Sequence, residues 1–325
     1  MNKINRLFIS LALTALVVPA LPAVAQSTYP TRTVRLIVPS SPGGGTDISA
    51  RILAPQLTQF LGQQVIVENR PGAGTMIGGE AVARAAPDGY TLLMGISTLA
   101  INPAMYKKVP YDALKDLAPI SQAVALSNVL VIHPSLPSRN LKAFIAFATA
   151  RPGELNFASA GKGTSPHLSM ELFLVMAKLK MLHVPYKGSG PGVTDLIAGH
   201  VPVMMPNMLS AQPHIKSGRL RALGVTGSKR APGADDIPTI AEAGVPGYEA
   251  VQWYGVLAPA GTPGDIISKL HAGVVRAVQN PEVRKRLMND GAEPVGSSPA
   301  EFAAYIKAET DKWAKVIKAA GIDPN

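Results

Sequence analysis

The sequence predicts an α/β protein of two similar halves, each a mostly parallel β-sheet flanked by helices. First, short β-branched runs alternate with segments of helical periodicity across short links, which is typical of parallel strands with right-handed crossovers. Second, the succession of a strand, a Gly-rich loop and a helix occurs near residue 40 and again near residue 160. Third, 325 residues with 47% hydrophobic and 16% charged side chains are too apolar for a disordered chain. This length suffices for two domains of about 150 residues each.

Residues 1–25 have the features of a secretory signal peptide. Lys3 and Arg6 supply a positive start, and the apolar stretch 7–18 is too short to span a bilayer. The small residues at 23–25 fit the cleavage pattern of such peptides. We expect cleavage at the end of this segment and export to a bacterial periplasm. The alternative is an N-terminal membrane anchor.

In the first half, apolar residues alternate between strand-like and helix-like spacing. We expect strands at 33–38, 64–68 and 90–94, and helices at 46–61 and 72–85. Pro55 falls inside the first of these helices, so it either kinks the helix or marks a later start.

The pattern restarts in the second half with a buried run from about Ala123 to His133. A helix at 141–150, a strand at 155–158 and a helix at 168–180 follow. Near the C-terminus, Thr262 to Asp265 and Ser298 to Glu301 match the capping-box pattern that begins helices, each with Pro at the first helical position.

The two Gly-rich loops carry the chemical argument. Glycines let a ligand approach the main chain, and the free N–H groups at a helix start attract anions. In an α/β sheet both loops lie at the carboxyl ends of strands, where ligands bind. The alternative is that each loop is only a tight link. The first loop supplies Ser40, Ser41, Pro42, Gly43, Gly44, Gly45, Thr46 and Asp47; the second supplies Ser159, Ala160, Gly161, Lys162, Gly163, Thr164 and Ser165.

Two titratable residues of these loops need separate treatment. The carboxylate of Asp47 would repel an anion, so we expect it to cap the helix and point aside. His167 follows the second loop and either donates to a ligand or caps the loop.

Several kinds of chemistry are excluded. The absence of Cys excludes disulfides, thiol nucleophiles and cysteine-ligated metals. Neither loop is a phosphate-binding P-loop, no nucleophile elbow is present, and no two histidines have the spacing of a metal pair. We therefore expect no cofactor, no metal and no enzymatic activity. The net charge of +10 favours anionic partners, but no nucleic-acid-binding motif is present.

Six segments together resemble the Bug-type extracytoplasmic solute receptors of tripartite tricarboxylate transporters. They are VPSSPGGGTDISAR (38–51), VIVENRPGAGTMIGGE (65–80), APDGYTLLMG (86–95), FASAGKGTSPHLSMELF (157–173), HVPYKGSGPGVTDLIAGHV (183–201) and WYGVLAPAGTP (253–263). The resemblance covers essentially the whole chain after the signal peptide. It implies a periplasmic-binding-protein clamshell with lobe one at 27–126 plus 252–325 and lobe two at 127–251.

The resemblance also implies a function. Members bind small carboxylates between the lobes, so the two loops, with His167 and Asn207, would form the cleft walls. Acidic residues are common in the family where this chain has Pro202 and Pro206. Because an amino-acid ligand needs such a counter-charge for its ammonium group, a plain mono- or dicarboxylate is expected here.

The expected partners follow from the same resemblance. We expect a monomer that passes its ligand to membrane permease subunits. One alternative is a sensor receptor that docks on a membrane signalling protein. Another is a periplasmic enzyme with His167 as its base.

Overall fold

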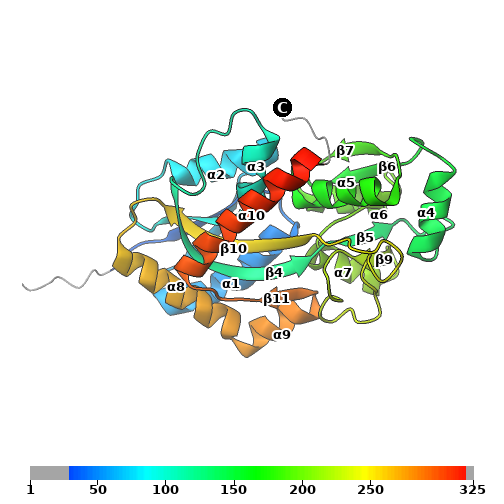
Figure 1. Ribbon diagram of the computed structural model, residues 1–325. Helices are drawn as coiled ribbons and strands as arrows, with labels where there is room; N and C mark the ends of the chain where they lie inside the picture. The colour runs from blue at the N-terminus through cyan, green and yellow to red at the C-terminus, as the bar shows by residue number, and fades with distance from the viewer. Residues whose placement is uncertain (1–28, 320–325) are drawn as a thin grey trace, which may run out of the picture.

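The computed structural model describes residues 29–319, and the expected signal peptide lies outside this range. The chain forms two lobes, each built on its own sheet (Figure 1). The sheet of lobe one has the order β11-β4-β10-β3-β1-β2. Its strands are β1 (Val34–Val38), β2 (Val65–Asn69), β3 (Thr91–Ile96), β4 (Leu117–Ser127), β10 (Val251–Pro259) and β11 (Ala292–Pro294). The sheet of lobe two has the order β7-β6-β8-β5-β9, with β5 (Val129–Ile132), β6 (Asn156–Ser159), β7 (Leu182–Pro185), β8 (Val203–Met204) and β9 (Arg221–Val225).

Helices cover both faces of the sheet in lobe one. One core contains α1 (Gly45–Leu61), α8 (Gly264–Gln279) and α9 (Pro281–Asn289), whereas the other contains α2 (Met76–Ala83), α3 (Thr98–Met105) and α10 (Pro299–Ala319). The short 3-10 turn η1 (Ala73–Thr75) precedes α2. Successive strand residues supply opposite cores, because side chains alternate along a strand: Leu36 packs in the first and Ile37 in the second.

Lobe two repeats this arrangement. Its helices α4 (Leu141–Thr149) and α5 (Ser165–Ala177) share one core, and α6 (Ser189–Ile197) and α7 (Met208–Lys216) share the other. In β5, Leu130 and Ile132 belong to the first core, and Val129 and Val131 to the second. A strand buried on both faces explains why this run is apolar throughout.

Two strands connect the lobes. β4 and β10 lie side by side and antiparallel through the middle of the molecule (Figure 1). The run expected as one buried segment from Ala123 is in fact two strands in different sheets, because β4 ends at Ser127 and β5 begins at Val129. The C-terminal segment, from β10 onward, then adds β10, β11, α8, α9 and α10 to lobe one.

The sheets are more mixed than the predicted mostly parallel arrangement. β1 pairs in parallel with β2 and β3, but β10 pairs antiparallel with β3 and β4. In lobe two, β6 pairs in parallel with β7 and β8, whereas β5 pairs antiparallel with β8 and β9. In lobe one, β4 and β10 are antiparallel because β4 leads out of the lobe and β10 leads back into it.

The predicted helix starts differ by a few residues. Helix α1 begins at Gly45 and continues through Pro55, so a later start is wrong. Helix α5 begins at Ser165 rather than Leu168, which brings its first amides into the second Gly-rich loop. The second capping box is confirmed: Ser298 N donates to Glu301 Oε2 at 2.8 Å, and Glu301 N donates to Ser298 Oγ at 3.2 Å.

Candidate functional site

A small cavity lies between the lobes, where the two Gly-rich loops meet. Its volume is about 20 Å³, room for about one water molecule. Both lobes line it, through Ser40, Gly44, Gly45, Thr46, Thr75, Ile96, Ala160, Thr164, Pro166, Ser189, Asn207, Gln252 and Tyr254. The lobes are in contact around it, since Ser41 N donates to the Lys187 carbonyl at 3.3 Å and the Tyr106 hydroxyl donates to the Lys162 carbonyl at 3.0 Å. The structure is therefore a closed arrangement.

Four helices point their N-termini at this cavity. The lining includes the first residues of α1, α5 and α6, and Asn207, the N-cap residue of α7. The first N–H groups of a helix lack internal partners and carry the positive end of the helix dipole. No charged side chain is among the lining residues. An anion in this cavity would therefore be held by main-chain dipoles rather than by a counter-ion.

Half of the first loop faces the cavity. Ser40, Gly44, Gly45 and Thr46 line it, and the Ser40 hydroxyl is buried without a hydrogen-bond partner. Ser41, Pro42 and Gly43 instead form the rim. Ser41 Oγ donates to the Lys187 carbonyl, and the Pro42 carbonyl lies against Gly190. Within residues 29–319, the amides of Gly44 to Asp47 have no acceptor, so four N–H groups of this loop are available to a ligand.

Asp47 points away from the cavity, as expected. Its carboxylate accepts hydrogen bonds from Gly43 N, Arg51 Nε and Asn69 Nδ2, all at 3.0 Å. Burial alone would raise the pKa of Asp47, but these hydrogen bonds and the charge of Arg51 outweigh burial, and the pKa is lowered. The expectation that Asp47 caps the helix is wrong: the N-cap residue is Gly44, and Asp47 stabilises the loop from the third helical position. This hydrogen bond also removes the Gly43 amide from the set available to a ligand.

The second loop contributes fewer residues than expected. Ala160 and Thr164 line the cavity, whereas Ser159, Gly161, Gly163, Ser165 and His167 do not. Gly161 N donates to Ser159 Oγ at 3.1 Å, and Gly163 N donates to His167 Nδ1 at 3.2 Å. His167 thus caps the loop. The amides of Ala160 and Ser165 have no acceptor within the described chain, so they remain available.

Several lining residues were missed by the sequence analysis. Thr75, Ser189, Gln252 and Tyr254 come from η1, α6 and β10, far apart in the chain. Gln252 Oε1 accepts from Ser97 Oγ at 3.1 Å, and Gln252 Nε2 donates to the Tyr254 hydroxyl at 3.3 Å. Burial raises the pKa of Tyr254, so its hydroxyl stays protonated. Three of the segments quoted for the resemblance contain these residues, and that was the available signal: VIVENRPGAGTMIGGE contains Thr75, HVPYKGSGPGVTDLIAGHV contains Ser189 and WYGVLAPAGTP contains Tyr254.

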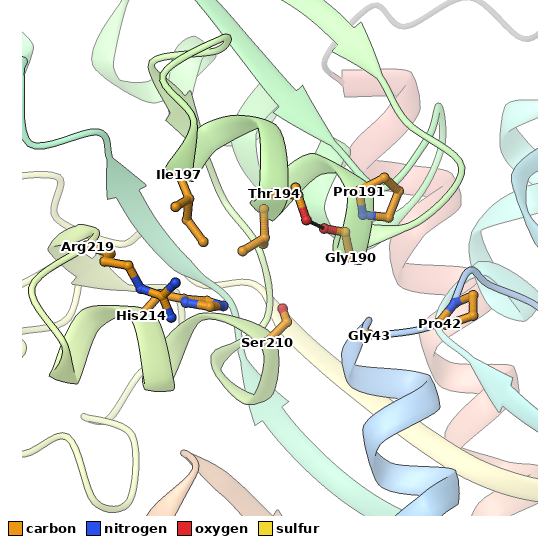
Figure 2. Close-up of a pocket in the computed structure, with 10 residues that line it drawn as sticks. Pro42, Gly43, Gly190, Pro191, Thr194, Ile197, Ser210, His214 and Arg219 are labelled. Carbon is orange, nitrogen blue, oxygen red and sulfur yellow. Dashed lines mark hydrogen bonds between the residues drawn. The ribbon is translucent and has the colours of Figure 1, made fainter.

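A larger groove of about 460 Å³ lies just outside the rim (Figure 2). Figure 2 shows His214 and Arg219 along its lobe-two side, with Pro42 and Gly43 of lobe one opposite. Pro42 has no N–H, and the Gly43 N–H is already bonded to Asp47. Lobe one therefore offers no main-chain donor to this groove, which makes the smaller cavity the stronger candidate for a site that both lobes share.

Two other kinds of site were sought in the described part of the chain. Residues 29–319 contain no group of three or more His, Asp or Glu side chains that could hold a metal ion. The same residues include no helix that is long and apolar enough to cross a membrane.

Comparisons with known proteins find a matching family and similar proteins. Residues 49–322 match the TctC family, described as the tripartite tricarboxylate transporter family receptor. Protein BugT of Bordetella pertussis is 42% identical over 300 residues, which cover 92% of each chain.

Three solved structures are also similar over 89% to 91% of this chain and all of theirs. The R. palustris protein Rpa4515 with adipate is 38% identical, with a TM-score of 0.89. The periplasmic binding protein BugD is 33% identical, also with a TM-score of 0.89. MatC from Rhodopseudomonas palustris with bound malate is 33% identical, with a TM-score of 0.83.

Proposed function

This chain belongs to the tripartite tricarboxylate transporter receptor family, and on that premise we propose that it captures a small organic carboxylate between its lobes. Members of the family are solute-binding receptors and not enzymes. We further propose that the protein is exported to the periplasm and passes its ligand to membrane permease subunits. The signal-peptide pattern of residues 1–25 supports export.

One observation carries the carboxylate assignment. Four helix N-termini converge on a cavity that no charged side chain lines. Such an end stabilises negative charge through its unpaired N–H groups. The unbonded amides of the lining residues Gly44, Gly45 and Thr46 on lobe one and of Ala160 on lobe two supply donors on both sides. A carboxylate that bridges them would favour a closed arrangement over an open one, with the lobes further apart than in this structure, whose cavity has room for about one water molecule.

The same cavity disfavours amino acids. Their ammonium group would be buried beside helix N-termini with no carboxylate in the lining to compensate it. The relatives that are described with adipate and with malate support a dicarboxylate without an amino group. We therefore propose a mono- or dicarboxylate of this kind as the ligand.

The lobe boundaries also remain a proposal: 27–126 with 252–325 for lobe one, and 127–251 for lobe two. The sheet memberships support this division, since β5 to β9 all fall within 127–251. In this division the chain crosses between the lobes twice: β4 leads to lobe two, which carries the second Gly-rich loop, and β10 returns the C-terminal segment to lobe one.

The test is a thermal-shift screen with malate, adipate and aspartate. Aspartate is the matched control for malate because an ammonium group replaces the hydroxyl. A carboxylate at about 100 times its Kd should stabilise the protein by about 2.7 kcal/mol. We expect malate or adipate to raise the melting temperature and aspartate to leave it unchanged. If millimolar carboxylates without an amino group have no effect, or if aspartate stabilises as well as malate, the proposal fails.

A further inference from the structure

Two imidazoles lie behind the second Gly-rich loop, and neither lines the cavity: His167 is buried and His183 is half-buried. His167 is on α5 and His183 on β7, with ring centroids 4.0 Å apart and planes 24° from parallel. Phe157 of β6 stacks on His183 at 5.0 Å. Two stacked imidazoles cannot both carry a charge cheaply, so this packing favours neutral rings that can accept hydrogen bonds.

His183 reaches the loop through a serine hydroxyl. His183 Nε2 lies 2.6 Å from Ser159 Oγ, and the same oxygen accepts the Gly161 N–H at 3.1 Å. We assign the hydroxyl hydrogen of Ser159 to the contact with His183, so that Nε2 is the unprotonated nitrogen of a neutral ring; in the other tautomer Nε2 would donate to the serine oxygen. Gly161 has a φ of +125°, which only glycine adopts without strain. We expect the hydrogen bond to Ser159 Oγ to fix the direction of its N–H group.

His167 is the acceptor for the N–H group of Gly163, the other glycine of this loop. Its Nδ1 accepts the Gly163 N–H at 3.2 Å, while its Nε2 faces Glu171 Oε1 at 3.5 Å. The two histidines thus accept, one directly and one through Ser159, the N–H groups of both glycines. The peptide of Ala160 lies next to Ser159, and Ala160 lines the cavity.

We propose that His183 is a positioning residue for the ligand: a neutral acceptor that, through Ser159, holds the Gly161 amide and keeps the second loop in its ligand-binding shape. The proposal rests on the proposed function, because it concerns the wall of the same cavity. The hydrogen-bond acceptor at His183 Nε2, and not the size of the ring, sets the geometry of the loop.

Burial and the surrounding charges keep His183 neutral. Burial, His167 and the Lys162 ammonium together lower the pKa of His183 to about 3. Glu171 is the carboxylate that faces this cluster, and it contacts His167 rather than His183. A protonated His183 would place a donor against Ser159 and leave the serine hydrogen without an acceptor. His183 therefore keeps its acceptor near neutral pH.

The test compares three variants of the His183–Ser159 pair with one matched control. His183→Gln keeps a neutral acceptor near Nε2, His183→Leu removes it, and Ser159→Ala breaks the link. The control is His133→Leu, since His133 Nδ1 lies 2.7 Å from Ser135 Oγ in an equivalent pair. His133 follows β5, which runs antiparallel to β8 and therefore to β6. It thus lies at the opposite end of these strands from the second Gly-rich loop.

The first readout needs no ligand: hydrogen exchange of the Gly161 amide, measured by NMR. We expect His183→Leu and Ser159→Ala to speed exchange at Gly161 by about tenfold or more, with His183→Gln and His133→Leu near wild type. The second readout is the Kd for malate and adipate, which should rise about tenfold in the first two variants, the cost of one lost hydrogen-bond partner.

The outcomes separate this proposal from the proposed function. If neither malate nor adipate binds the wild type, the exchange data still decide whether His183 positions the loop. If His183→Leu leaves Gly161 exchange and ligand Kd unchanged, or if His183→Gln is as damaged as His183→Leu, the positioning role is overturned.

Discussion

Gly45, the first residue of α1, packs directly against Asn207, the N-cap residue of α7, across the junction of the two lobes. A Cβ on Gly45 would stand 2.2 Å from Asn207 Oδ1 and 2.7 Å from the Tyr254 hydroxyl. Real Cβ atoms do not approach other atoms so closely, so only glycine allows two helix N-termini from different lobes to meet here. The convergence of helix N-termini at the candidate site therefore requires a residue without a Cβ at Gly45.

Gly45→Ala should weaken ligand binding by preventing full closure of the lobes. Alanine suits a helix start, but its Cβ also crowds the buried Tyr254 hydroxyl of lobe one, so we expect the melting temperature without ligand to fall modestly. We expect the Kd for malate or adipate to rise by about tenfold or more, measured by calorimetry. Gly264→Ala is the control, because Gly264 begins α8 and a Cβ added to it would meet nothing within 4 Å. Equal affinities of Gly45→Ala and wild type would contradict the closed geometry.

Asn207→Asp should separate anion binding from stability. Asn207 Oδ1 accepts the Ser210 N–H at 3.0 Å, and aspartate caps a helix equally well, so stability should be preserved. A carboxylate in this uncharged lining would repel the ligand, and we expect at least about a tenfold loss of affinity at pH 8. Asn140→Asp is the control, since Asn140 caps the exposed start of α4 in the same way. Unchanged binding in Asn207→Asp would exclude Asn207 from the anion site.

Asp47→Asn should cost stability without weakening ligand binding. An amide in place of the carboxylate would set a donor against Arg51 and Asn69, and we expect a loss of about 1–3 kcal/mol by urea denaturation at pH 7. Because folding lowers the pKa of Asp47, its stabilising effect is present at neutral pH and is lost as the pH falls. The difference from wild type should therefore shrink below about pH 4. A large loss of malate or adipate affinity would place Asp47 in the site after all.

His183 should make the protein less stable in mild acid. The pKa of His183 is lowered from 6.5 to about 3 on folding, so between these values the unfolded chain binds a proton that the folded chain does not. The contribution of neutral His183 to the free energy of unfolding is complete above pH 6.5. It is lost as the pH falls toward 3, by at most about 1.4 kcal/mol per pH unit. The free energy of unfolding should fall less steeply in His183→Gln than in wild type between pH 7 and 5. Parallel slopes would mean that His183 is not held neutral.

Local sequence signals predicted the elements well because their causes are local. The alternation in β1 and the helical spacing of α1 each reflect which face of a segment is buried. The two Gly-rich loops were recognisable as anion-attracting helix starts for the same reason, and parts of both line one cavity. The run from Ala123 to His133 was misjudged because periodicity cannot tell a strand that continues from one that changes sheet.

The contribution of each residue to the cavity depended on hydrogen-bond partners two to four residues away and on strands far away in the chain. Which amides remain free was set by Asp47, Ser159 and His167, whose acceptor atoms occupy the glycine N–H groups. Gln252 and Tyr254 reach the cavity only because β10 crosses back from lobe two to pair with β3 and β4. No spacing within a single segment encodes that proximity.

The amino-acid order alone determined the succession of strands and helices, the two donor-rich loops and the absence of thiol chemistry, since each of these follows from neighbouring residues. Tertiary structure alone decided that four helix starts share one uncharged cavity and that two histidines support its wall. The physical reason is that hydrogen bonds and burial join groups by distance in space, whereas sequence patterns record only distance along the chain.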